Sequence, residues 1–240
     1  MHNFMSIVEA KKKAVFSADD FGISKLANAN ILRIIRTGKL DRVEVMISEN
    51  LSAEEVEELK KSQVKLDIHL HLVDYNSNYW RGDRRLREGA VKRAAIFLLK
   101  YVLGKTAPEK VELQWAIQIE KFEELFGKAP DGIGSHEYIH YFPPYLRAIL
   151  RLGEKYKISF VRFGRSDFVC DSSVTKVLNW LRKKGREIVK KTAMQTTDYI
   201  VSFDWVNNLD FLAKLPKETL TEVVFHPERE EEFNFLEKLQ

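Results

Sequence analysis

The sequence has a single cysteine, Cys170, among its 240 residues. One thiol excludes an internal disulfide and a zinc site built from several cysteines, and it suits a reducing compartment. The chain has no apolar run of the length that a bilayer span requires. Its first residues, Met1 to Lys13, lack the apolar centre of a secretion signal. We therefore expect a cytoplasmic protein without a membrane span.

A large excess of one charge is also missing. The chain has 39 Lys and Arg residues against 35 Asp and Glu residues, a net charge of +4. Nucleic-acid-binding domains usually concentrate basic residues on one face, whereas the basic run Lys183-Lys184-Gly185-Arg186 is typical of a solvated surface. We predict no nucleic-acid partner. The hydrophobic share of 45% is ordinary for a globular protein and sufficient for a full core.

Short apolar segments alternate with amphipathic helical patterns along the whole chain. Such alternation predicts an α/β fold with a mainly parallel sheet, and about seven units favour an irregular (β/α) barrel formed as one domain over residues 1–240. The predicted strands are 14–18, 42–47, 64–72, 132–140, 160–163, 198–203 and 223–226. The predicted helices are 24–37, one that begins at 52, 111–126, 143–156, 173–184 and 230–239.

Two helix ends have specific sequence patterns. Ser52 and Glu55 have the spacing of a capping box, in which each side chain bonds the backbone at the other position. Gly185 follows the predicted helix 173–184, and glycine commonly ends a helix. We therefore expect a helix that starts after Ser52 and another that stops before Gly185.

Residues 74–110 interrupt the alternation. The segment starts polar and aromatic, with Trp80 as a candidate for stacking on a sugar ring, then becomes basic and ends in an apolar helix over 91–103. An insertion after the third strand would overhang a site at the strand ends, so we predict a lid or a substrate-binding subdomain. The alternatives are a helix packed on the barrel, an interface in a homodimer, or a basic amphipathic helix that touches a membrane.

The first predicted strand ends in two adjacent aspartates, Asp19 and Asp20. In α/β folds, reactive groups gather at the carboxyl ends of the strands. Adjacent carboxylates repel each other and need a cation, a proton or solvent for stabilisation. A helix cap could account for one carboxylate but not readily for both. The pair therefore indicates a functional site.

Five histidines, His69, His71, His136, His140 and His226, fall near the ends of three predicted strands. A lone strand histidine is more often a satisfied core residue than a ligand, but five beside an aspartate pair are harder to explain in that way. Because side chains alternate along a strand, His69 and His71 should share the inner face of the barrel, and so should His136 and His140.

An interior lined with imidazoles and carboxylates needs compensation, which a bound metal supplies. One Asp and two His form the ligand set of several catalytic metal sites and leave positions open for water. We predict Asp20, His69 and His136 as ligands. The alternative is that His71 or His140 replaces one of them.

Four further residues are candidates for catalysis. Asp19, beside the predicted ligand Asp20, could accept a proton from the attacking water. His226, at the end of the last strand, could protonate the leaving group, and His140 is the alternative. Arg162 could orient Asp19 or bind substrate, and its other interpretation is a structural salt bridge.

The chain resembles a known family through motifs that extend over nearly its full length. These are Ala18-Asp19-Asp20-Phe21-Gly22-Ile23-Ser24, Ile68-His69-Leu70-His71-Leu72, Gln118-Ile119-Glu120-Lys121-Phe122, Ser135-His136-Glu137-Tyr138-Ile139-His140, Arg162, and His226-Pro227. In this order and spacing they are similar to the YdjC-like carbohydrate deacetylases, which include chito-oligosaccharide deacetylases. The resemblance implies a polysaccharide-deacetylase-like (β/α) barrel. It also implies a divalent metal, Mg²⁺ or Zn²⁺, held by Asp20, His69 and His136.

The activity that the resemblance implies is hydrolysis of N-acetyl groups from amino sugars or chito-oligosaccharides. This sequence departs from the family pattern at four positions: Asp67 and Glu228 stand where glycines are usual, and Gly134 and Tyr138 replace an Asp and a His. Groups around the ligands orient them and shape the pocket, so these departures bear on the substrate. The changes at 134 and 138 motivate an alternative, a catalytically silent protein that binds metal and carbohydrate.

Overall fold

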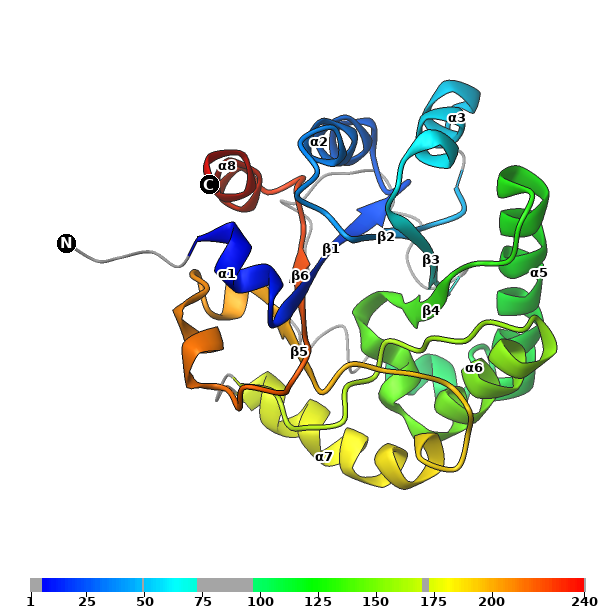
Figure 1. Cartoon of the computed structure of the whole chain (residues 1–240). Helices are drawn as coiled ribbons and strands as arrows, with labels where there is room; N and C mark the ends of the chain where they lie inside the picture. The colour runs from blue at the N-terminus through cyan, green and yellow to red at the C-terminus, as the bar shows by residue number, and fades with distance from the viewer. Residues whose placement is uncertain (1–5, 49, 73–96, 170–172, 240) are drawn as a thin grey trace.

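The computed structural model describes residues 6–48, 50–72, 97–169 and 173–239. Within them, six parallel strands form one curled sheet in the order β4-β3-β2-β1-β6-β5 (Figure 1). The strands are β1 (Ala14–Phe21), β2 (Arg42–Val45), β3 (Lys65–Leu70), β4 (Gly132–Ser135), β5 (Tyr199–Ser202) and β6 (Thr221–Phe225). The predicted α/β fold with a parallel, barrel-like sheet is confirmed.

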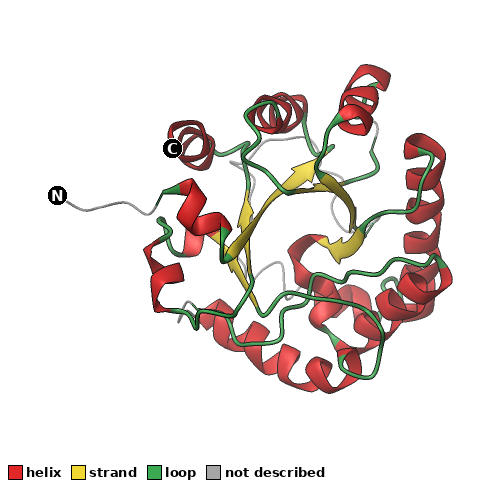
Figure 2. Ribbon diagram, viewed as in Figure 1, coloured by secondary structure: helices red, strands yellow, loops and turns green. Residues whose placement is uncertain are grey.

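Helices surround the outer side of this sheet (Figure 2). They are α1 (Ile7–Lys11), α2 (Lys25–Ile35), α3 (Ala53–Lys61), α5 (Pro108–Phe126), α6 (Pro143–Lys155), α7 (Ser173–Val189) and α8 (Glu230–Lys238). The capping box predicted at Ser52 and Glu55 is present at the start of α3, with both of its hydrogen bonds formed. Among the described residues, no helix is both long enough and apolar enough to cross a bilayer.

In the part of the chain that the structure describes, the sheet has six regular strands, whereas the pattern predicts seven. The predicted strand 160–163 contributes only two isolated bridges, Ile133 to Val161 and Phe160 to Gln195. The backbone of Arg162 donates a hydrogen bond to the Ile133 carbonyl, with an N···O distance of 3.0 Å. The segment therefore lies beside β4 without forming a ladder, and this contact positions Arg162 next to the strand ends.

Among the predicted element ends that the structure does not reproduce, two have a clear physical reason. The predicted strand 132–140 stops at Ser135, because Glu137 and Tyr138 have φ values of 56° and 54° and the chain turns into a 3-10 helix, η3 (His136–Tyr141). Helix α7 also continues through Gly185. A Cβ at Gly185 would lie 2.5 Å from Cζ of Phe163. This glycine therefore permits close packing of the helix and does not end it.

Most of the predicted insertion, residues 74–96 with Trp80, lies outside the described residues. Its described end includes a helical stretch over 97–102. The buried ring of Phe97 packs against Phe142 and Tyr145, at centroid distances of 5.3 and 5.9 Å. The lid, the homodimer interface and the single-domain organisation stay predictions.

Candidate metal centre

A β-bulge positions the two adjacent aspartates. Ala18 of β1 pairs with Val43 of β2, and Phe21 pairs with Val45, so three steps along β1 match two along β2. Asp20 has a φ of 67°, a conformation that aspartate tolerates better than most residues. A bulge of this kind re-aims side chains. Asp19 and Asp20 are both buried, with 4% and 2% of their surface exposed.

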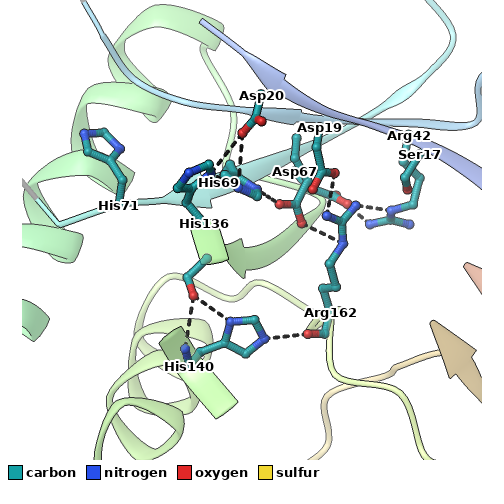
Figure 3. A network of polar contacts seen from close by, with 12 residues as sticks. Ser17, Asp19, Asp20, Arg42, Asp67, His69, His71, His136, His140 and Arg162 are labelled. Atoms are coloured by element: carbon teal, nitrogen blue, oxygen red, sulfur yellow. Dashed lines mark hydrogen bonds and ion pairs between the residues drawn. The ribbon is translucent and has the colours of Figure 1, made fainter. Parts of the chain in front are cut away.

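Three donor atoms from three distant segments form what we call the Asp-His-His triangle (Figure 3). Nδ1 of His136 lies 3.0 Å from Oδ1 of Asp20 and 3.2 Å from Nε2 of His69. Nε2 of His69 lies 3.6 Å from Oδ1 of Asp20. Asp20 and His69 lie near the ends of β1 and β3, and His136 follows β4. The three side chains predicted as ligands are therefore close together.

The triangle has the dimensions of a divalent metal site. Zn²⁺ and Mg²⁺ bind nitrogen and oxygen donors at about 2.1 Å. With tetrahedral or octahedral angles, donors at that distance are separated by about 3.0 to 3.4 Å. The observed separations of 3.0, 3.2 and 3.6 Å fall in or close to this range. The two imidazole nitrogens suit a transition metal such as Zn²⁺, and the carboxylate oxygen suits Mg²⁺ as well.

The protonation of the triangle also suits a cation. Burial acts to raise the pKa of the Asp20 carboxyl, but the charge and hydrogen bond of His136, together with His69, lower it below its ordinary range. Burial lowers the pKa of His69 well below its ordinary value, so its imidazole is neutral. Asp20 raises the pKa of His136 against the effect of burial. The lowered pKa of Asp20 and the raised pKa of His136 both favour a positive charge at this position, which a metal ion would supply.

Arg162 connects Asp19 to two further buried carboxylates. Its Nη1 donates a hydrogen bond to Oδ1 of Asp19 at 2.5 Å, and its Nη2 donates to Oε1 of Glu222 at 2.7 Å. Its Nε lies 3.0 Å from Oε1 of Glu44. The side chain is 1% exposed. Arg162 thus forms a buried salt-bridge network, and the same contacts hold the carboxylate of Asp19 in place. Substrate binding by Arg162 stays a prediction.

Burial raises the pKa of the Asp19 carboxyl above its ordinary value, and the Arg162 guanidinium opposes this effect. Asp19 is therefore a more basic carboxylate than an exposed one. It sits beside the triangle and is held by a fixed cation. This combination suits a group that accepts a proton.

Asp67, one of the departures from the family pattern, is also paired. Both of its oxygens lie 2.5 Å from nitrogens of the Arg42 guanidinium, which in turn stacks over the ring of Phe160 at 4.0 Å. A Cβ at Gly132 would lie 2.6 Å from this pair, so glycine is needed on the adjacent strand. Burial raises the pKa of Asp67 to about 6, although Arg42 opposes the rise. Asp67 faces the barrel interior with His69, as strand alternation predicts.

His140 has a different position from that expected of a ligand or a catalytic acid. It is fully buried, its Nδ1 lies 2.7 Å from Oγ of Ser135, and its Nε2 lies 2.6 Å from the carbonyl oxygen of Arg162 (Figure 3). Burial lowers its pKa to about 3. The neutral ring, with Nε2–H donating to the carbonyl, satisfies both contacts. Both ring nitrogens are thus used within the protein, and His140 stands outside the triangle.

His71, the other alternative ligand, is also separate from the triangle (Figure 3). Strand β3 ends at Leu70, and the backbone of His71 exchanges hydrogen bonds with the side-chain amide of Gln118. The alternation that would place His71 beside His69 ends with the strand.

Tyr138, a further departure from the family pattern, stacks on Tyr141 at a centroid distance of 5.0 Å.

His226 follows β6 and is a cation at neutral pH. Burial acts to lower its pKa, but Glu232 and the nearby Asp19 outweigh burial and raise the pKa to about 9. The carboxylate of Glu232 accepts a hydrogen bond from the backbone N–H of His226 at 2.7 Å. The imidazole retains some access to solvent, with 16% of the side chain exposed. A protonated, partly accessible imidazole can donate a proton to a leaving group.

Sequence reasoning missed three charged residues of this interior: Arg42, Glu44 and Glu222, which are at most 6% exposed. In β2, the valines at 43 and 45 alternate with Arg42 and Glu44. That alternation suits a strand with one solvated face equally well. In a barrel with a charged interior, the polar positions of a strand face inward. The carboxylates at the predicted strand ends were the feature of the sequence that indicated such an interior.

Comparison with known proteins identifies relatives over most of the sequence. A model of the YdjC-like protein family matches residues 13–238. The chitooligosaccharide deacetylase of Escherichia fergusonii is 27% identical over 130 residues, which are 54% of this chain and 50% of that protein. The carbohydrate deacetylase of Vibrio campbellii is 27% identical over 161 residues, which are 67% of this chain and 63% of that protein. The matched regions thus span about half to two thirds of these relatives.

A solved structure has a similar fold. The crystal structure of an Enterococcus faecalis V583 protein, described as a candidate cellobiose-phosphate cleavage protein, aligns with a TM-score of 0.58 and 19% identity. The alignment covers 90% of this chain and 80% of that one. At this identity the likeness concerns the fold alone. Because the family model matches nearly the whole sequence, the chain belongs to the YdjC-like protein family.

Proposed function

We propose that this protein is a metal-dependent hydrolase that removes N-acetyl groups from amino sugars or chito-oligosaccharides. The observation that carries the proposal is the Asp-His-His triangle with Asp19 held beside it by Arg162. The deacetylase names of the relatives support the reaction class and a carbohydrate substrate. Asp20, His69 and His136 would hold a divalent ion. When bound, such an ion lowers the pKa of a water ligand and polarises the acetyl carbonyl.

The remaining steps belong to side chains around the triangle. Asp19 accepts the proton of the attacking water, and Arg162 holds its carboxylate in place and opposes the rise in its pKa that burial causes. His226, protonated at neutral pH, donates a proton to the nitrogen that leaves as the free amine. The reaction thus consumes one water and yields acetate and an amino sugar. His140 takes no part in proton transfer and supports the backbone of Arg162.

The experiment that tests the proposal measures acetate released from a panel of N-acetylated mono- and oligosaccharides, with Mg²⁺, Zn²⁺, Co²⁺ or Mn²⁺ added in turn. We expect release with at least one pair of substrate and metal, and its loss in Asp20→Asn. Tight sugar binding without acetate release across the panel would instead favour the alternative, a catalytically silent metal- and carbohydrate-binding protein. Release of acetate from O-acetyl esters alone would show a different substrate class.

A further inference from the structure

Glu44 contacts a predicted metal ligand from the neighbouring strand. It lies in β2, is fully buried, and places one carboxylate oxygen, Oε2, against Nδ1 of His69. Its other oxygen, Oε1, lies 3.0 Å from Nε of Arg162. The carboxylate therefore joins a ring nitrogen of His69 to the cation that holds Asp19.

The space that this carboxylate fills is opposite Gly134. Gly134 of β4 pairs in register with His69 of β3. A Cβ built at Gly134 would lie 2.4 Å from Oε1 and 3.0 Å from Oε2 of Glu44, so a side chain here would force the Glu44 carboxylate to move. Residue 134 is also a position where this sequence departs from the family pattern, by having glycine in place of aspartate. The carboxylate beside the histidine thus comes from β2 in this chain, and β4 leaves room for it.

We infer that Glu44 is a positioning residue of the metal centre: it accepts the Nδ1–H of His69 and so directs the Nε2 lone pair toward Asp20 and His136. The inference rests on the proposed function, since a fixed lone pair matters only if the triangle binds a metal. A histidine that binds metal through one nitrogen commonly donates its other N–H to a carboxylate, which fixes the tautomer and the orientation of the ring. Losing such a partner usually weakens metal binding by about 10- to 100-fold.

Glu222 provides a matched control. It is a fully buried glutamate whose Oε1 accepts hydrogen bonds from Nε and Nη2 of Arg162 and from the hydroxyl of Ser17. Glu44→Gln and Glu222→Gln make the same chemical change in the same charged network. They differ in the contact with His69, so a difference between them measures that contact.

The first test reads the tautomer of His69 directly. In the metal-free wild type labelled with ¹⁵N-histidine, long-range ¹H–¹⁵N spectra should show His69 protonated at Nδ1, with His69→Gln used to assign its signals. Protonation at Nε2 would overturn the inference. This readout needs no metal and no activity, so it can fail while the proposed function stands. Absence of metal binding in the wild type would instead contradict the proposed function.

The second test measures metal affinity by calorimetry with Zn²⁺ or Mg²⁺. We expect Glu44→Gln to weaken binding about 10-fold or more, and Glu222→Gln to stay within about threefold of the wild type, below that range. Equal effects of the two variants would overturn the inference. The tautomer measured in the wild type decides the outcome if Glu44→Gln does not fold.

The third test moves the carboxylate from β2 to β4. Glu44→Ala and Gly134→Asp should each weaken metal binding, the second because its Cβ overlaps Glu44. The double variant should bind metal at least about tenfold more tightly than Glu44→Ala, because residues in contact are coupled and their effects do not add. Additive losses in the double variant would contradict the inference that a carboxylate beside Nδ1 of His69 supports metal binding.

Discussion

Replacing His140 with glutamine should make the free energy of unfolding depend less steeply on pH below about 6.5. The wild-type imidazole is buried and neutral, with Nε2–H donating to the carbonyl of Arg162 and Nδ1 accepting from Ser135. Burial, together with the charges of Arg162 and Arg182, lowers its pKa from the ordinary 6.5 to about 3, although the hydrogen bond to the carbonyl opposes the fall. The glutamine side chain of the variant would not titrate.

The magnitude follows from proton linkage. Below pH 6.5 the unfolded chain binds a proton at His140 that the folded protein does not, so stability is lost as the pH falls from 6.5 toward about 3. At pH 5 this group alone lowers the free energy of unfolding by about 2 kcal/mol relative to pH 7.5, since each pKa unit corresponds to about 1.4 kcal/mol. The variant lacks this contribution, while the other titrating groups are shared.

The assay is urea denaturation of both proteins at pH 7.5 and pH 5. The wild type should lose about 2 kcal/mol more than His140→Gln between the two pH values, even if the variant is less stable at both. Ser135→Ala, which removes a partner but no titrating group, should keep the wild-type pH dependence. Parallel profiles of the wild type and His140→Gln would refute the assignment of a neutral, structural His140.

Three further predictions concern the barrel and its site. Gly185→Ala should destabilise the protein by about 1–3 kcal/mol through overlap with Phe163, despite the better helix propensity of alanine, and a raised melting temperature would contradict the packing described. Asp19→Asn should bind metal as the wild type does, which calorimetry measures, but lose about 100-fold or more in acetate release. Acetate release at the wild-type rate would contradict the role of Asp19 as the base. A metal at 100 times its Kd should raise the free energy of unfolding of the wild type by about 2.7 kcal/mol, and an equal gain in Asp20→Asn would show binding elsewhere.

Much of the fold was predictable from local chemistry. The capping box at Ser52 and the alternation of Asp67 and His69 with apolar neighbours depend on residues close in sequence, and both are present in the structure. The proximity of Asp20, His69 and His136 followed from a topological rule, that parallel strands bring their carboxyl ends to one edge. The roles of these residues stay predictions.

The errors arose where distant contacts decide the outcome. Gly185 looked like a helix end, but the ring of Phe163 explains why a glycine stands there. The strand through His136 and His140 was broken by positive φ angles at Glu137 and Tyr138, which do not follow from propensity. The contact of Glu44 with His69 exists because β2 lies beside β3, and the sequences of single strands do not determine their order in the sheet.

The central claim is that three distant side chains bind one divalent ion. An anomalous-scattering map of crystals grown with Zn²⁺ tests it most directly. The account predicts one peak about 2.1 Å from Oδ1 of Asp20, Nε2 of His69 and Nδ1 of His136. A protein that releases acetate while its metal peak lies elsewhere, or while these three atoms bind none, would contradict it.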